Sequence, residues 1–303
     1  MQTSALELAE APVFRLHLRS TLPHVDHAAI EDYCLKENGW AGLGWGLWEG
    51  EQPSGLTWDE YTRRKEAKGE GVDESVRRLH NMPVGALVWT RRTDGTFWLG
   101  RITSKWEYRA GPQARKLDMF NLRRCRWHNV GAEDAVPGKI LNNFRPARTL
   151  NPVKDHASVD YSRRLWSRVT GEPFAAAPID SRTVIESLLS PTDLEDFVAA
   201  YLQDRHDLVL ISRHPSTAGY EYVFKAKRDG RRAVASVKSG GSIIDLSTLP
   251  NDGDIDVWIY QVSGEPAGES HDNVRHIATE DLVDFINERP TVQPDQVLYW
   301  LNR

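Results

Sequence analysis

The sequence predicts a protein of two parts that combines α+β and α/β organisation. We expect a tryptophan-rich β-barrel, followed by a domain in which helices flank a mixed sheet. A chain of 303 residues can hold two ordinary cores, and eight of its eleven tryptophans lie between Trp40 and Trp127. Three prolines between Asn142 and Ala177 discourage any continuous element there. We therefore place a barrel module in residues 1–150, a linker in 151–180 and a second domain in 181–303. Within the linker, Tyr161–Val169 can form a short basic helix.

The composition is that of a globular protein, with 40% hydrophobic and 27% charged residues. No apolar run approaches the roughly 20 residues that a membrane-spanning helix needs. The first residues lack the basic-then-apolar order of a secretory signal, so we expect a cytoplasmic protein with no membrane partner. Cys34 and Cys125 are too few and too far apart for a disulfide framework or a zinc ribbon, and we expect both to be buried thiols.

Elements of the first part follow from periodicity, glycines and caps. Thr57 and Glu60 have the spacing of a capping box, which predicts the start of a helix. Asp94-Gly95 between two apolar runs predicts a hairpin over 86–91 and 96–103. Glycines interleaved with tryptophans in 39–50 indicate a loop or strand with close backbone approach. The remaining expected elements are strands at 13–18, 106–109 and 122–127 and helices at 28–36 and 73–82.

The second part is expected to begin with helices. Ser190-Pro191 separates a helix at 183–189 from an amphipathic helix at 192–203. Strands are expected at 208–212, 220–226, 232–237 and 256–262, a helix at 279–288, and a last strand or helix at 297–301. A helix followed by a strand meander and crossovers predicts an α/β domain with a mixed sheet.

Three segments of the second part resemble the Mrr-type branch of the PD-(D/E)xK restriction endonuclease superfamily. They are Thr192–Val198, Gly219–Val223 and Ala235–Gly240. In that family, a Glu on the first helix, an acid on the second strand and an acid or Gln two residues before a Lys on the third strand converge on a metal and the scissile phosphate. Carried over by position, these residues are Glu195, Glu221, Ser236 and Lys238. The resemblance implies a DNA endonuclease of the restriction or phage-defence type that uses Mg²⁺ or Mn²⁺ and acts as a homodimer.

The spacing of these residues suits phosphodiester hydrolysis. Residues two apart on a strand share a face, so Ser236 and Lys238 point the same way, with Glu221 beside them on the paired strand. Carboxylate oxygens hold a metal that polarises the phosphate, and an ammonium group orients water or offsets developing charge. Lys238 suits the second role.

Ser236 departs from the family pattern, because a neutral hydroxyl stands where the third metal ligand is expected. Three possibilities are open. Asp245, which follows the Gly240-Gly241 turn, turns toward the site as a ligand; Ser236 holds a metal-bound water; or the domain is a degenerate nuclease retained for DNA binding.

Each of these residues also has a structural explanation without catalysis. Glu195 follows Thr192 by three residues, which is the spacing of a capping box. Glu221 and Lys238 can form a surface ion pair between strands. Ser236 can be an ordinary strand serine.

The first part resembles the small EVE/PUA-like barrels that precede nuclease domains. The resemblance rests on Val84–Trp89, Thr96–Thr103, Trp106–Tyr108 and Asn121–Trp127. It implies a pocket in which aromatic side chains stack on a flipped, often modified DNA base while basic side chains hold phosphates. The alternatives for the aromatic residues are that the tryptophans form the barrel core or that the barrel binds a protein or peptide. The alternative for the basic stretch from Arg101 to Arg126 is that it forms a solvated surface. The candidate aromatic residues are Trp45, Trp48, Trp106 and Tyr108, and the candidate basic residues are Arg101, Lys105 and Arg109.

Overall fold

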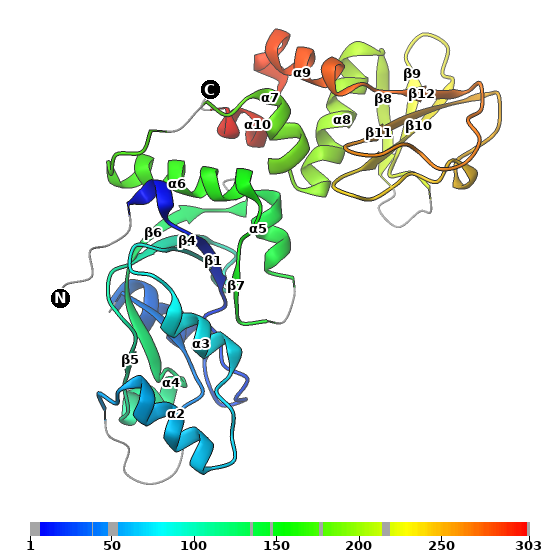
Figure 1. The fold of residues 1–303 in the computed structure, drawn as a ribbon. Helices are drawn as coiled ribbons and strands as arrows, with labels where there is room; N and C mark the ends of the chain where they lie inside the picture. The colour runs from blue at the N-terminus through cyan, green and yellow to red at the C-terminus, as the bar shows by residue number, and fades with distance from the viewer. Residues whose placement is uncertain are drawn as a thin grey trace. The chain divides into compact units, whose positions relative to one another are not determined.

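The computed structural model divides the chain into two units (Figure 1). The first comprises Met1–Val136 with Ile140–Ala176, and the second Pro137–Lys139 with Ala177–Arg303. The structure describes residues 7–37, 39–47, 54–133, 136–145, 148–175, 178–213 and 219–301. Two mixed sheets with associated helices make up the fold, which is α+β in character.

A seven-stranded mixed sheet forms the frame of the first unit. Its order is β2-β6-β4-β3-β1-β7, with β5 paired to β6. β1 runs parallel to β3, and the other described pairs are antiparallel. The strands are β1 Val13–Leu16, β2 Trp40–Leu43, β3 Leu87–Arg91, β4 Phe97–Ile102, β5 Glu107–Tyr108, β6 Asn121–Gly131 and β7 Leu150–Pro152. The helices are η1 Leu8–Glu10, α1 His27–Glu31, η2 Asp32–Glu37, α2 Trp58–Ala67, α3 Glu74–Asn81, α4 Pro112–Leu117, α5 Gly138–Asn143 and α6 His156–Thr170.

Local sequence signals of the first unit are confirmed in atomic detail. The Thr57 hydroxyl accepts the Glu60 main-chain N–H at 3.3 Å, and the Glu60 carboxylate accepts the Thr57 N–H at 2.9 Å, which completes the expected capping box of α2. β3 and β4 form the expected hairpin around Gly95. Gly95 has a φ of +88°, which glycine adopts without steric cost because it has no side chain. Both cysteines are buried free thiols, as expected.

The segment that we expected to be a linker, 151–180, is largely structured. Pro152 of β7 pairs with β1, and α6 packs on the first unit through the buried side chains of Leu165 and Trp166. Two hydrogen bonds fix α6: the Trp89 indole donates to the Ser162 hydroxyl at 2.9 Å, and the Arg163 guanidinium donates to the Ala11 carbonyl at 3.0 Å. The prolines lie before and after α6, so they do not interrupt the helix. The first unit extends to residue 176.

The second unit is built on a five-stranded sheet in the order β12-β11-β10-β9-β8. β8, β9 and β10 form an antiparallel meander, whereas β10, β11 and β12 run parallel. The strands are β8 Leu208–Arg213, β9 Tyr222–Ala226, β10 Arg232–Lys238, β11 Ile255–Gln261 and β12 Val274–His276. The helices are α7 Ser181–Thr183, η4 Val184–Leu188, α8 Pro191–Arg205, η5 Leu246–Thr248, α9 Thr279–Glu288, η6 Pro290–Val292 and α10 Asp295–Trp300.

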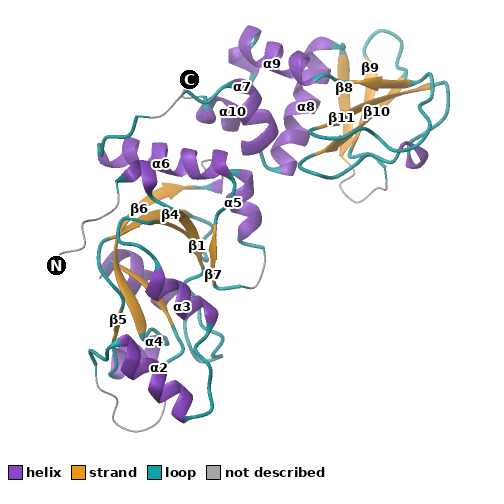
Figure 2. Ribbon diagram, viewed as in Figure 1, coloured by secondary structure: helices purple, strands orange, loops and turns teal. Residues whose placement is uncertain are grey.

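The two faces of this sheet are covered differently. Figure 2 shows helices α7 to α10 gathered on one side of it. On β9, Tyr222 bonds to Asp196 of α8, while its neighbour Val223 packs with Leu246 and Leu249 from the β10–β11 connection. Neighbouring strand residues point to opposite faces, so α8 covers one face and this connection the other. The expected helices therefore lie on one face of the mixed sheet, and a loop with one 3-10 turn covers the other face.

The described residues contain no helix that is long and apolar enough to span a membrane. The sequence did not predict β7, β12 or α4, which have three, three and six residues. Such short elements carry too little periodicity to be recognised.

Candidate functional site

Glu221 lies at the end of the β9–β10 pair, one residue before β9 begins. Its main-chain N–H donates to the Ala235 carbonyl at 3.0 Å, so the ladder continues to this residue. One carboxylate oxygen accepts the Val237 N–H at 2.9 Å, and the other accepts from the ammonium of Lys238. The Glu221 side chain is only 12% exposed and that of Lys238 33%. This pair is therefore partly buried and fixed to the main chain, unlike a mobile surface ion pair.

Glu195 is not the capping residue of α8. The cap is Ser190, whose hydroxyl accepts the Asp193 N–H at 3.1 Å, while the Asp193 carboxylate accepts the Ser190 N–H at 3.2 Å. The capping box thus lies two residues earlier than the spacing from Thr192 indicated, because Pro191 occupies the first helical position. Glu195 stands free of the cap, with its side chain 18% exposed and 3.5 Å from the Arg213 guanidinium.

Glu195 and Glu221 are close enough to influence each other. Burial raises the pKa of Glu195, and the negative charge of Glu221 raises it further, while Arg213 and Lys238 oppose the shift. Two carboxylates that repel each other in a half-buried place favour either a shared proton or a bound cation. The structure therefore brings together three of the four expected catalytic side chains: Glu195, Glu221 and Lys238.

Ser236 differs from these three. It is 1% exposed in the middle of β10, and among the described residues its hydroxyl has no hydrogen-bond partner. A buried hydroxyl that makes no hydrogen bond is costly, so this position is more than a solvated strand serine. Ser236 is nevertheless closed off from solvent, which does not favour the expected role as holder of a metal-bound water.

Asp245 is engaged elsewhere. Its carboxylate accepts from the Ser247 N–H at 3.0 Å and from the Ser247 hydroxyl at 2.7 Å, which caps η5 and lowers the pKa of Asp245. In the part of the chain that the structure describes, no three His, Cys, Asp or Glu side chains form a group that could hold a metal. The expected recruitment of Asp245 is thus not seen, and Glu195 and Glu221 are the available carboxylates.

Arg213 was not predicted from the sequence, although it completes the site. From the end of β8 it approaches both Glu195, at 3.5 Å, and Asp196, at 3.7 Å, and its guanidinium lies over the Tyr222 ring. No spacing pattern relates Arg213 to Glu195, because they meet through tertiary packing.

In the first unit, the aromatic residues that we expected in one pocket lie in different places. Tyr108 is fully buried, and its hydroxyl accepts the Leu47 N–H at 2.9 Å, so it belongs to the core and cannot stack on a base. Trp45 borders a different cavity of about 230 Å³ beside Asp118. Trp48 lies outside the described residues. Only Trp106 lines the larger cavity described below.

The three expected phosphate-binding residues also lie in different environments. Arg101 is buried, donates to the Gly85 carbonyl at 3.2 Å and pairs with Glu172. Its guanidinium is therefore not available to a phosphate. Arg109 lies over the Trp40 ring at 4.5 Å, whereas Lys105 is exposed at the cavity that Trp106 lines.

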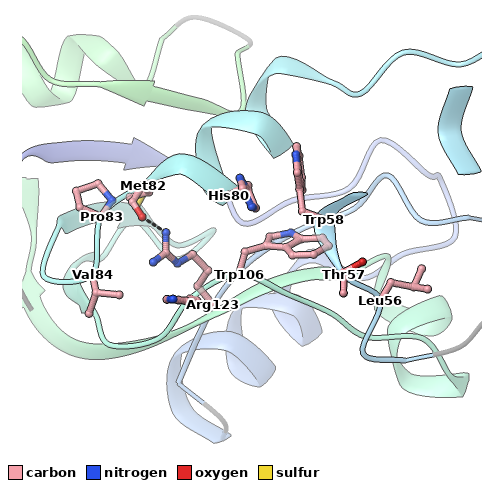
Figure 3. Close-up of a pocket in the computed structure, with 10 residues that line it drawn as sticks. Leu56, Thr57, Trp58, His80, Met82, Pro83, Val84, Trp106 and Arg123 are labelled. Atoms are coloured by element: carbon pink, nitrogen blue, oxygen red, sulfur yellow. Dashed lines mark hydrogen bonds between the residues drawn. The ribbon is translucent and has the colours of Figure 1, made fainter. Parts of the chain in front are cut away.

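This cavity has a volume of about 380 Å³ and aromatic walls (Figure 3). Trp58 stacks on His80 with ring centroids 3.9 Å apart, and Trp106 meets Trp58 edge-on at 5.3 Å. The Trp106 indole donates to the Asn121 side chain at 3.2 Å, which holds the ring in place. The lining residues are Leu56, Thr57, Trp58, His80, Met82, Pro83, Val84, Lys105, Trp106 and Arg123.

Arg123 forms a fixed part of the cavity wall. Its guanidinium donates to the carbonyls of Leu79, Met82 and Ser104, and burial lowers its pKa to about 10. Among the described lining residues there is no carboxylate, so the charged groups at this cavity are cationic. The sequence did not single out Trp58 or His80, which come from α2 and α3.

Comparison with known proteins gives no match to a family model, a curated protein or a solved structure. The function is therefore argued from the chemistry of these two sites.

Proposed function

We propose that the second unit hydrolyses DNA phosphodiester bonds with a divalent metal, in the manner of the PD-(D/E)xK endonucleases. The observation that carries this proposal is the Glu221–Lys238 pair, which is partly buried and fixed to the main chain at the end of the β9–β10 ladder. The charge of Glu221 also raises the pKa of Glu195, which burial raises most. Carboxylates from a helix and a strand end, with a lysine two residues beyond a strand serine, match the order that the family uses.

The residues present suit Mg²⁺ or Mn²⁺. Magnesium keeps several waters and is commonly held by one or two carboxylates together with substrate phosphate oxygens, so Glu195 and Glu221 suffice as protein ligands. Glu195 and Glu221 would hold the metal, which would supply a Lewis acid for the phosphate and a more acidic water. Lys238 is placed to offset charge on the phosphate, and Arg213 to orient Glu195.

A cleavage assay tests this proposal. Supercoiled plasmid, modified and unmodified, is incubated with the protein and Mg²⁺ or Mn²⁺, beside Lys238→Ala and the exposed control Lys154→Ala. We expect cleavage by the parent and the control and a loss of at least about 100-fold in Lys238→Ala. Cleavage that persists in Lys238→Ala contradicts the assignment of the site. Cutting of both strands would accord with a homodimer, which sedimentation of the parent protein checks.

A second candidate is a nuclease-like protein that binds DNA without cutting it. Ser236 favours this candidate, because a buried hydroxyl stands where the family has its third ligand. Retained DNA binding without cleavage under any metal would support it. Restoring an acid through Ser236→Asp, with cleavage gained, would show that only this ligand was missing.

For the first unit, we propose that the cavity of Trp58, His80, Trp106 and Lys105 receives an extruded DNA base. Aromatic stacking is worth about 1–3 kcal/mol per base, and the cationic wall suits a nucleotide better than a cationic ligand. Trp106→Leu should weaken binding of oligonucleotides that carry a modified base, whereas Trp98→Leu, outside this cavity, should not. Binding that ignores salt would favour a peptide partner, since phosphate contacts impose a steep salt dependence.

A further inference from the structure

Two cations face each other across the β9–β10 hairpin. Lys225 and Arg232 are direct partners in the register of the two strands, and both are exposed. Side chains of directly paired residues lie on the same face, about 5 Å apart at their Cβ atoms. Like charges in this arrangement destabilise a sheet, so the pair is unfavourable unless something lies between the two groups.

The surrounding cations are neutralised, whereas this pair is not. Lys227, Arg228 and Arg231 each approach a carboxylate, from Asp207, Asp229 and Asp256, at 3.0–3.4 Å. Over the described residues from 178 to 301, Lys225 and Arg232 are the only Lys and Arg without an ion pair to an acid. The contact that Arg232 does make is to the Tyr220 hydroxyl, at 3.4 Å.

Arg232 and Lys238 lie at opposite ends of β10, on the face of the sheet that the β10–β11 connection covers between them, where Val234 and Ser236 are buried. Arg232, Ser236 and Lys238 are separated by even numbers of residues on β10, as are Lys225 and Glu221 on the β9 side. Arg232 and Lys238 are the first and last residues of β10, about 20 Å apart at 3.3 Å per residue. A duplex advances by roughly six base pairs over about 20 Å of its axis, so one duplex is long enough to reach both ends of β10.

We infer that Lys225 and Arg232 together bind one backbone phosphate of a nucleic acid, at the opposite end of β10 from Lys238. A phosphate between the two side chains replaces their repulsion with two charge-assisted contacts. The inference rests on the proposed function only for the nature of the polyanion, because the unpaired cations and their register do not depend on cleavage.

A salt series of DNA binding by the full chain, without metal, tests this inference. The double variant Lys225→Gln/Arg232→Gln is compared with Lys227→Gln/Arg228→Gln, which removes the same charge from two acid-paired neighbours. We expect the first to bind duplex DNA roughly tenfold more weakly at low salt, whatever the sequence, with a salt slope smaller by about 0.9. The second should bind nearly as well as the parent. Equal losses in both variants would mean that overall charge alone is responsible and would overturn the inference.

Two further measurements identify the ligand and separate this inference from the nuclease proposal. If inorganic phosphate displaced DNA as effectively as an equal concentration of DNA phosphate does, a nucleic-acid ligand would be contradicted. It would also be contradicted if the Lys225/Arg232 variant lost binding to phosphatidylserine vesicles but not to DNA. The thermal stability of the Lys225/Arg232 variant should not fall, since a repulsive pair has been removed, and this excludes misfolding as the cause. If no variant or parent cuts DNA while the Lys225/Arg232 effect on binding remains, the nuclease proposal fails and this inference stands.

Discussion

The ammonium of Lys238 donates to one carboxylate oxygen of Glu221, and the other oxygen of Glu221 accepts the Val237 main-chain N–H at 2.9 Å. A side chain thus extends the β9–β10 ladder by one bond at the point where the strands separate. Glu221 is held by main chain and side chain together, so its position does not depend on a flexible rotamer. That rigidity is what a site for metal or phosphate requires.

Removing the Lys238 side chain should destabilise the folded protein as well as abolish its proposed activity. In Lys238→Ala, the partly buried Glu221 carboxylate loses its cation, and we expect unfolding to become easier by about 1–3 kcal/mol. Lys238→Arg keeps the charge and should recover most of that loss. Urea unfolding measures both, with Lys154→Ala as a control expected within about 0.5 kcal/mol of the parent. An unchanged midpoint in Lys238→Ala would place the pair among ordinary surface ion pairs.

The raised pKa of Glu195 predicts a stability effect with a definite sign. Because the folded state holds the Glu195 proton more tightly than the unfolded state does, this group favours folding at low pH, and its contribution is lost as pH rises through the folded pKa. Glu195→Gln should therefore raise the melting temperature relative to the parent at pH 8 and by less at pH 4. Thermal unfolding across pH checks this, with the exposed Glu66→Gln as control. A constant difference across pH would contradict it.

The local sequence signals succeeded where a few neighbouring residues determine the structure. The Thr57–Glu60 box and the Asp94-Gly95 hairpin depend on contacts within a few residues, and both are confirmed. The composition of 151–180 predicts a linker with a short helix over Tyr161–Val169, whereas α6 runs from His156 to Thr170 and belongs to the first unit. Its burial against Trp89 is a tertiary contact that no local pattern records.

The candidate site was only partly predictable for the same reason. The positions of Glu195, Glu221 and Lys238 followed from the order of motifs along the chain. Arg213 joins them from another strand, and Tyr108 is excluded from the other site only because its hydroxyl bonds to Leu47. Whether a tryptophan or tyrosine lies in a core or at a cavity depends on packing, which composition does not reveal.

A divalent metal should stabilise the parent protein through Glu195 and Glu221. A ligand that binds only the folded state adds about 2.7 kcal/mol at 100 times its Kd, so Mg²⁺ or Mn²⁺ should raise the melting temperature by several degrees. The double variant Glu195→Gln/Glu221→Gln should lose this response. Calcium serves as a probe that binds similar oxygen ligands without supporting cleavage in the assay. A response that survives in the double variant would place the metal elsewhere.

Tyr108→Phe should show whether Tyr108 serves the core of the first unit or the binding of a ligand in its cavity. The change leaves the buried Leu47 N–H without its acceptor, at a cost of about 1–3 kcal/mol, yet it leaves the ring and the cavity walls in place. We expect a lower urea midpoint with unchanged oligonucleotide binding, measured on protein that is fully folded at the assay temperature. Weaker oligonucleotide binding at an equal fraction of folded protein would mean that Tyr108 takes part in binding.

Ser236→Ala tests directly what the unpartnered hydroxyl does. If that hydroxyl is a structural liability, its removal should leave stability unchanged or raise it by up to about 1–2 kcal/mol, because no hydrogen bond among the described residues is lost. If it instead takes part in hydrolysis, Ser236→Ala should lower the cleavage rate without lowering the urea midpoint. Ser181→Ala is a suitable control, since that buried hydroxyl has a partner, the Asn287 side chain at 3.3 Å, and its loss should cost stability. The cleavage rate and the urea midpoint together decide between the two roles. A hydroxyl without a role in hydrolysis leaves the rate unchanged in Ser236→Ala, whereas a hydroxyl that takes part lowers the rate without lowering the midpoint.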